Sequence, residues 1–269
     1  MSPAPLRVLR SIAGDGYAVR EIEYAAGFRQ APHLHESDGI TVLIAGAIRE
    51  TAAGREEVAS CLSVVVKPAG VVHADQVGPR GARTLQVLLD PDFGVLRPSG
   101  EGGLGPWRWI HAGAGTRGLL SLLRALREAD GQGGATVEDR VLEILDEATG
   151  ADASVRRDPP AWLRRARESL DDRVGEGVRV RDLAAEAGVH PVSLARAFRR
   201  QYGASVSEYR RRARLHRAAA AIERSDWDLT RIAHAHGYVD HSHMCREVRA
   251  TTGLTPSELR GLAGRSRRA

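Results

Sequence analysis

Hydrophobic positions in the first hundred residues are grouped in short runs that are typical of β-strands. Apolar and β-branched residues dominate 17–24, 39–51, 61–70 and 82–90, and Gly, Pro or Asp residues bound these runs. Short strands with such boundaries are expected in an all-β barrel or sandwich. The segment 98–106, which is rich in Gly and Pro, ends this pattern.

Beyond residue 116 the hydrophobic period becomes that of a helix. Two segments, 117–130 and 136–148, each place apolar residues on one broad stripe, which predicts amphipathic helices. Thr136 is a candidate N-cap, with Asp139 in the first turn. We expect both helices to pack on the barrel and to supply a dimer surface. Their apolar positions are Leu119, Leu120, Leu122, Leu123 and Leu126 in the first and Val137, Val141, Leu142 and Leu145 in the second.

The chain from Ala161 onward is helical in pattern and contains an internal repeat. The stretch 182–210 aligns with 231–260, and the paired prolines of 151–160 predict a linker before them. The aligned pairs are Leu183 with Ile232, Ala184 with Ala233, Gly188 with Gly237 and Ser193 with Ser242, followed, after one extra residue in the second copy, by Gly203 with Gly253 and Arg210 with Arg260.

Each copy has the pattern of a helix-turn-helix. An early Ala permits close contact between helices, and Gly188 or Gly237 supplies the permissive backbone of the turn. The second helix has apolar residues on one face and arginines on the other, as a helix in the DNA major groove requires. A long helix over 207–225 is expected to join the copies. Two copies in tandem are a much stronger signal than one.

Charge is distributed unevenly along the chain. Up to Arg156 there are 16 basic and 20 acidic residues, a net charge of −4, and from Arg157 onward there are 23 and 14, a net charge of +9. A basic part of this kind usually meets a polyanion, most often nucleic acid, although a solvated cationic face has the same composition.

Composition excludes several protein classes. A hydrophobic share of 42% and a charged share of 27% are typical of a globular protein. No apolar run approaches the roughly 18 residues of a membrane span, and the first residues lack the apolar core of a signal peptide. Cys61 and Cys245 are too few for a disulfide framework. We therefore expect a cytoplasmic protein without a membrane partner.

Residues 161–263 resemble the DNA-binding domain of the AraC family of bacterial transcription regulators. The second copy has that family's Ala233-to-Gly237 turn and its later Gly-Leu-Thr-Pro-Ser run at 253–257, followed by Arg260. In the second copy, Met244 and Val248 stand where the family usually has phenylalanines, and Cys245 is also atypical. In the first copy, Val206 stands where the family frequently has a proline.

The resemblance implies that two recognition helices of one chain enter successive major-groove segments. Its expected DNA-contacting residues are Val192, Ser193, Arg196, Arg199, Arg200, His241, Ser242, Arg246 and Arg249. Arginine can pair with guanine through two hydrogen bonds, whereas Val192 could only contact a thymine methyl. Further candidates for phosphate contacts are the run 210–212 and Arg214.

Four histidines and a cysteine fall within residues 234–245 and raise the alternative of a zinc site. On a helix, only His241 and Cys245 are spaced to share a face. Two ligands are fewer than the four of a structural zinc site. We therefore interpret the later side chains of this group as surface groups of a DNA-reading helix, and His234 and His236 as half-exposed packing residues of the supporting helix.

Two segments of the β-rich region resemble the motifs of the cupin barrel. Residues 27–46 contain His33-x-His35 between glycines, and 68–73 contain Pro-x-Gly-x-x-His73. Cupins use such histidines, with a Glu, to hold a metal, but Gly39 occupies the position expected for that Glu. Strand alternation directs Glu36 and Asp38 away from the histidine pair.

The three histidines support alternative interpretations. His33, His35 and His73 could form a three-imidazole metal site, or the motifs could be vestigial in a sensor of small molecules. A catalytic cupin would also need an open metal position, and the sequence supplies no further acid, base or nucleophile constellation. We therefore expect no enzymatic activity and no obligatory cofactor. A metal sensor and a metal-dependent cupin enzyme remain as alternatives.

The expected fold class is a multidomain α and β protein. It comprises a cupin-like effector-binding β-barrel (1–98), a helical linker or dimerisation pair (99–155) and an all-α domain with two helix-turn-helix units (156–269). The expected function is sequence-specific transcription regulation, as activator or repressor, in response to a small effector. Expected partners are double-stranded DNA, the effector, a second copy of the chain and, as a further candidate, RNA polymerase.

Overall fold

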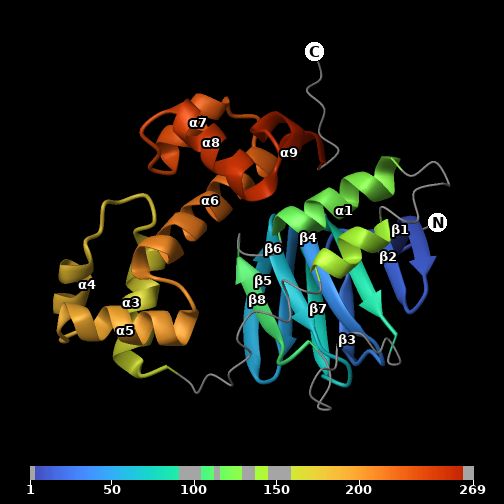
Figure 1. Cartoon of the computed structure of the whole chain (residues 1–269), viewed down its shortest axis with the longest axis horizontal. Coiled ribbons are helices and arrows are strands. Elements are labelled where there is room, and N and C mark those ends of the chain that lie inside the picture. The colour runs from blue at the N-terminus through green and yellow to red at the C-terminus, as the bar shows by residue number, and fades with distance from the viewer. Residues whose placement is uncertain (1–3, 91–103, 112–115, 129–136, 145–158, 263–269) are drawn as a thin grey trace.

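The computed structural model describes residues 4–90, 104–111, 116–128, 137–144 and 159–262. The predicted N-cap Thr136, the apolar position Leu145 and most of the predicted linker lie outside these residues. Within the described part, an antiparallel sheet is followed by two helices and then by a helical domain, as Figure 1 shows. This order agrees with the expected sequence of β-rich and helical regions.

In the part of the chain that the structure describes, eight strands form one sheet, and all of its strand pairs are antiparallel. Hydrogen bonding gives the order β1-β2-β7-β4-β6-β8, with β3 added beside β7 and β5 beside β4. The strands are β1 (Leu6–Gly14), β2 (Tyr17–Tyr24), β3 (Arg29–His33), β4 (Asp38–Ala52), β5 (Arg55–Ser60), β6 (Ser63–Lys67), β7 (His73–Leu89) and β8 (Arg108–His111). Because β8 pairs with β6, the sheet extends past residue 98, where the sequence predicted its domain to end.

The long strands β4 and β7 connect the two ends of the sheet. They pair from Asp38 with Leu89 to Ala52 with His73, and the register shifts near Gly46. Gly46 has a φ of +74°, and a Cβ atom there would lie 2.0 Å from the carbonyl oxygen of Gly81. Only glycine fits where the two bent strands approach so closely.

The two helices after the sheet bury the apolar stripes that the sequence predicted. Helix α1 (Thr116–Glu128) has all five predicted leucines buried. In the helix 137–144, Val137, Val141 and Ile144 are buried, whereas Leu142 is 41% exposed. The buried side chains pack within the chain. Among the predicted apolar positions that the structure describes in these two helices, Leu142 is the one that is exposed to solvent.

The carboxy-terminal helices form two halves that α6 joins. The helices are α3 (Ala161–Asp172), α4 (Val180–Glu186), α5 (Pro191–Tyr202), α6 (Val206–Arg224), α7 (Leu229–Ala235), α8 (His241–Thr252) and α9 (Pro256–Leu262). Ser205 and Glu208 form a capping box at the start of α6, which explains why the long helix begins there. None of the helices within the described residues is long and apolar enough to cross a membrane.

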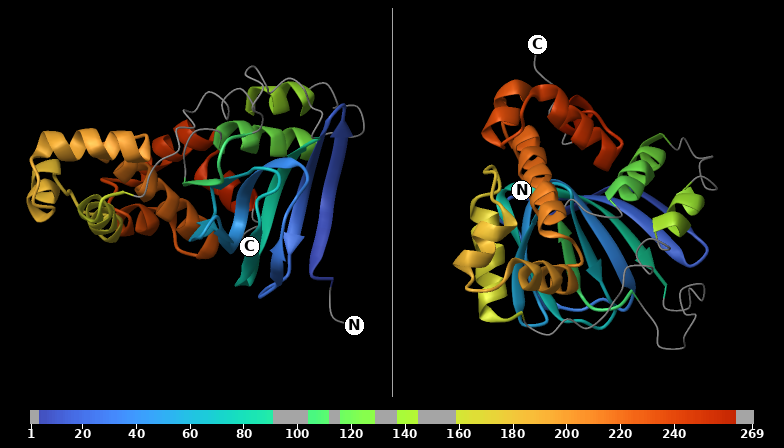
Figure 2. Two further views of the ribbon diagram at one scale, coloured as in Figure 1. Left: turned by 90° about the horizontal axis from the view of Figure 1, so that it is seen from below. Right: turned by 60° about the vertical axis from the view of Figure 1, so that its left-hand side comes forward.

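The two halves are attached to the sheet differently. Helices α3–α5 and the start of α6 enclose a core of their own around Phe198 and Leu194. Helices α7–α9 and the later part of α6 share one continuous core with α1 and the sheet. Figure 2 shows α3–α5 projecting to one side while α7–α9 lie nearer the sheet. Arg117 of α1 adds a direct link by donating to the carbonyl oxygen of Ala250, at 2.6 Å.

Candidate nucleic-acid interface and histidine cluster

The helix pairs α4–α5 and α7–α8 share one turn geometry. Gly188 and Gly237 both have positive φ, at +68° and +73°. In each turn the glycine N–H donates to the carbonyl oxygen three residues before it. A Cβ atom on Gly237 would also lie 2.4 Å from the carbonyl oxygen of Gly175. Both glycines therefore have the structural role that the repeat predicted.

The position of the extra residue in the second copy corrects part of the predicted alignment. The second helices begin at Pro191 and His241 and end before Gly203 and Gly253, so they are offset by the same number of residues throughout. The insertion therefore lies in the turn before α8, not within the helix. Val239, beside it, is 79% exposed.

This register changes which residues are equivalent. Ser193 corresponds to His243 and not to Ser242, as the sequence alignment had it. Buried side chains support the new register because Leu194 matches Met244 and Phe198 matches Val248, all with no exposed surface. Met244 and Val248 thus fill the core in place of the usual phenylalanines.

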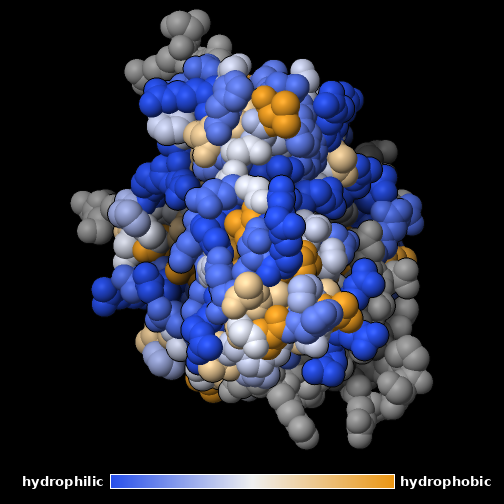
Figure 3. Space-filling model, turned by 90° about the vertical axis from the view of Figure 1, so that its left-hand side faces the viewer, coloured by the Kyte–Doolittle hydropathy of each residue, from blue (hydrophilic) through white to orange (hydrophobic). Residues whose placement is uncertain are grey.

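The predicted DNA-contacting side chains lie on the outer faces of α5 and α8. All of them are exposed except His241, which is partly buried and has its Nε2 atom 3.2 Å from the Sγ atom of Cys245. Arg196 and Arg246 occupy equivalent positions in the corrected register. Figure 3 shows that the side of the molecule with the first helix pair is mainly hydrophilic.

Two of the predicted phosphate-contacting arginines make contacts within the protein. Arg214 forms an ion pair with Glu247 at 2.7 Å and stacks on Tyr238, 4.3 Å from the ring centre. Arg210 donates to the carbonyl oxygen of Val178. Sequence position alone did not separate these inward-directed arginines from the exposed Arg211.

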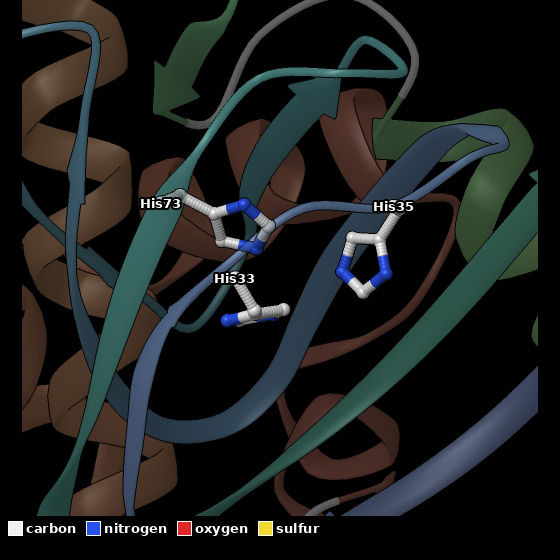
Figure 4. Close-up of side chains that lie close together, drawn as sticks. All are labelled: His33, His35 and His73. Carbon is white, nitrogen blue, oxygen red and sulfur yellow. The ribbon is translucent and has the colours of Figure 1, made fainter.

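The three histidines of the barrel motifs meet at one end of the sheet. His33 ends β3, His35 follows it, and His73 begins β7 opposite His33. One nitrogen from each ring lies within 4.8 Å of the others. Figure 4 shows the three imidazoles grouped around a common space. The structure therefore brings together the residues that the spacing predicted.

Two of the rings are held in the orientation that a metal ligand requires. The Nδ1 atoms of His33 and His73 lie 2.9 and 3.1 Å from the carbonyl oxygens of Ala31 and Val71. Since a carbonyl can only accept, each Nδ1 carries the proton and each Nε2 keeps a lone pair. Both Nε2 atoms are buried and lack a hydrogen-bond partner. This donor set fits a divalent transition metal.

Burial favours the neutral form of two of these imidazoles. It lowers the pKa of His73 to about 4, and the nearby Lys67 ammonium acts in the same direction. Burial and the neighbouring His33 also lower the pKa of His35. The carboxylates that the sequence placed on the other face stay away from the cluster, since Glu36 is exposed and Asp38 accepts from the Ala69 N–H at 2.8 Å.

Aromatic and charged side chains that the sequence did not single out lie behind the histidines. The rings of Trp107 and His73 are 4.6 Å apart, and the Lys67 ammonium lies 5.1 Å from the centre of Trp107. Lys67 pairs with Glu50 at 2.5 Å, and the Trp109 indole N–H donates to Glu50 at 2.7 Å. The sequence signal that could have indicated this group is Lys67, a charged residue at the end of the largely apolar strand β6.

For the alternative zinc site on α8, the described residues supply no third ligand. Among the described residues, the one group of three or more metal-ligating side chains is the cluster of His33, His35 and His73. His241 and Cys245 contact each other, while His234 on α7 is exposed. This agrees with the interpretation of the α8 histidines as surface groups.

Comparison with known proteins finds relatives of the helical domain. Residues 183–261 match the family model described as "Helix-turn-helix domain". Over 192 residues the chain is 28% identical to the HTH-type transcriptional activator RhaS of Pectobacterium atrosepticum, covering 68% of this chain and 66% of that protein. Over 94 residues it is 29% identical to the HTH-type transcriptional regulator YijO of Escherichia coli, covering 35% and 33%. The matches thus span between a third and two thirds of these relatives.

Among solved structures, the chain is similar to wild-type ToxT from Vibrio cholerae with bound unsaturated fatty acid. That likeness covers 93% of this chain and 96% of ToxT, at 12% sequence identity and a TM-score of 0.39. The relatives named above are described as transcriptional regulators. The residues that match the helix-turn-helix family model begin within α4 and end within α9, so they cover most of α4 and all of α5, α7 and α8.

Proposed function

We propose that this chain, whose carboxy-terminal domain belongs to the AraC family of transcription regulators, binds double-stranded DNA at specific sequences and responds to a small effector. The observation that carries this proposal is the repeated geometry of α4–α5 and α7–α8. Both pairs act as helix-turn-helix units, and both expose an arginine, Arg196 or Arg246, at the same position of the second helix.

The two second helices would read separate segments of the major groove. Arg196 and Arg246 are placed to pair with guanine, and Val192, which is 51% exposed, to contact a thymine methyl. Arg199 and Arg200, near the end of α5, are suited to the phosphates. By family resemblance, a homodimer would bind two half-sites, with RNA polymerase as a further partner.

The amino-terminal domain would be a cupin-like effector domain. Its histidine cluster and the Trp107 wall offer a place for a small ligand at one end of the sheet. His33, His35 and His73 would hold a divalent metal, which would supply an electrophilic centre for an anionic or polar effector. A metal sensor is therefore the second candidate. A cupin enzyme would further need an acid or base at the metal, and of the nearby charged groups Lys67 and Glu50 pair with each other.

Removing single arginines should separate base reading from phosphate binding. We expect Arg196→Ala to cost about 1–3 kcal/mol of binding free energy at one base position and to relax the sequence preference there. Arg200→Ala should weaken binding almost uniformly across sequences. Selection of bound duplexes from a random pool with each variant measures both effects. Identical sequence preferences for the two variants would contradict the division of roles. Failure of the wild-type protein to select any sequence would contradict the regulator proposal.

Metal binding tests the histidine cluster separately. Titration with Zn²⁺ should show one strong site per chain, and His33→Ala should weaken it at least about 10-fold because a direct ligand is lost. His234→Ala, at an exposed histidine of α7, is the matched control and should bind like the wild type. Equal binding by both variants would show that the cluster holds no metal and would favour a sensor with vestigial motifs.

A further inference from the structure

Strand β8 and the residue before it place three side chains, those of Trp107, Trp109 and His111, in a line from the histidine cluster to α6. Its pairing with β6 sets His111 opposite Ser63 and Trp109 opposite Val65. Trp107 continues the alternation just before the strand, where the Lys67 ammonium lies over its ring. Side chains two residues apart share a face of a strand. The line from Trp107 to His111 is about 13 Å long, at roughly 3.3 Å per residue.

The first end of this line contacts the candidate effector site. The Trp107 ring lies 4.6 Å from His73 and 6.0 Å from Trp109. The indole N–H of Trp107 is buried without a hydrogen-bond partner. A ligand that engages His73 would therefore change the packing of a side chain that no hydrogen bond holds in place.

The other end contacts the helix that joins the two DNA-binding halves. His111 Nδ1 lies 2.9 Å from the Ser63 hydroxyl, which in turn lies 3.0 Å from Nε2 of His216 on α6. Ser60 supplies a second hydroxyl, 3.1 Å from the same Nε2 atom. The rings of His111 and His216 are 5.0 Å apart. We name these four side chains the α6 contact cluster.

The surroundings of β8 allow it to shift. Within the described residues, β8 is hydrogen-bonded to a strand on one edge alone, that of β6. Helix α6 contributes Val206 to the core of the first half and Leu215 and Ile222 to the core of the second. A displacement of α6 at His216 would thus change how the two halves are placed relative to each other.

We propose that β8 transmits the state of the histidine cluster to α6, with Trp107 as the receiving side chain and the α6 contact cluster as the point of delivery. This inference rests on the proposed function for its biological meaning, since it names how the effector site would regulate DNA binding. The coupling itself is a property of the folded chain. It needs neither metal nor DNA to be measured.

Amide hydrogen exchange of full-length variants tests the coupling directly. Trp107→Leu removes the ring that faces His73 and should raise exchange at least about threefold in β8 and in the α6 segment around His216. Exchange in α5 should stay unchanged, because its core is separate. Phe28→Leu is the matched control, since Phe28 packs against the same buried cluster as Trp107 but stacks on Tyr24 of β2. It should leave α6 unchanged.

A second variant establishes the route. In a His216→Ala background, which removes the ring that contacts the Ser60 and Ser63 hydroxyls, Trp107→Leu should still affect β8 but no longer change exchange in α6. Trp107→Phe, which keeps a flat ring, should give a smaller change in the same segments and replaces Trp107→Leu if that variant does not fold. The inference is overturned if α6 does not respond to either Trp107 variant, if Phe28→Leu affects it equally, or if the response persists without His216. Those outcomes would leave the DNA selection and the Zn²⁺ titration untouched.

Discussion

Replacing Glu50 with alanine is expected to lower the free energy of unfolding by about 3–5 kcal/mol, because it leaves the buried Lys67 ammonium with Asp75, 3.9 Å away, in place of its close partner. The side chains of Lys67 and Glu50 are only 12% and 1% exposed. Burial opposes the charge of Lys67, but Glu50 and Asp75 outweigh it and hold the pKa of Lys67 above its usual value. The loss also removes the acceptor of the Trp109 indole N–H.

Chemical denaturation followed by circular dichroism measures this effect, and the neighbouring strand offers a control. Glu56 pairs with Arg49 at 2.6 Å, but both side chains are about half exposed. Glu56→Ala should therefore cost less than about 1 kcal/mol. The double variant Glu50→Leu with Lys67→Met should recover much of the loss, since it removes both charges. Similar losses for Glu50→Ala and Glu56→Ala would show that Lys67 finds another partner or reaches water.

The parts of the sheet that the sequence predicted are those whose side chains are largely buried. The run 17–24 coincides with β2, and 39–51 lies within β4. Strand β1 was missed because most of its side chains are exposed, which leaves no strong hydrophobic pattern. The first half of β7 was missed because Gly78, Pro79 and Gly81 indicate a break, whereas the strand passes through them with the help of a positive φ at Gly81.

Sequence patterns are short-range, so local motifs indicated the candidate site residues but could not predict contacts between distant segments. His33, His35 and the turn glycines have fixed spacing over short segments, and the resemblance to the second cupin motif added His73. The contact between Ser60 and His216 joins residues 156 positions apart. No short-range pattern encodes it. Likewise, the role of Arg214 depends on Glu247, which is brought near only when α6 and α8 pack.

His216 should make the protein progressively less stable below about pH 6.5. Burial, helped by the neighbouring His111, lowers the pKa of His216 to about 3. In the unfolded chain the imidazole takes up a proton near its ordinary pKa of about 6.5, while the folded chain resists protonation until about pH 3. Between these values the unfolded state binds more protons. The free energy of unfolding should therefore fall by up to about 1.4 kcal/mol for each pH unit of acidification.

Comparing variants isolates this contribution from other titrating groups. His111, Glu57 and Asp171 lie near His216, and the His111 ring, whose Nε2 atom is 3.6 Å from Glu57, lowers the pKa of Glu57. His216→Gln keeps a polar nitrogen near the Ser60 and Ser63 hydroxyls but cannot titrate, so its stability should depend less steeply on pH between about 6.5 and 4. His234→Gln, on the exposed surface of α7, should keep the wild-type slope. Equal slopes in the wild type and His216→Gln would mean that His216 takes up its proton at the same pH in the folded and the unfolded chain, and that the contact cluster does not shield it from water.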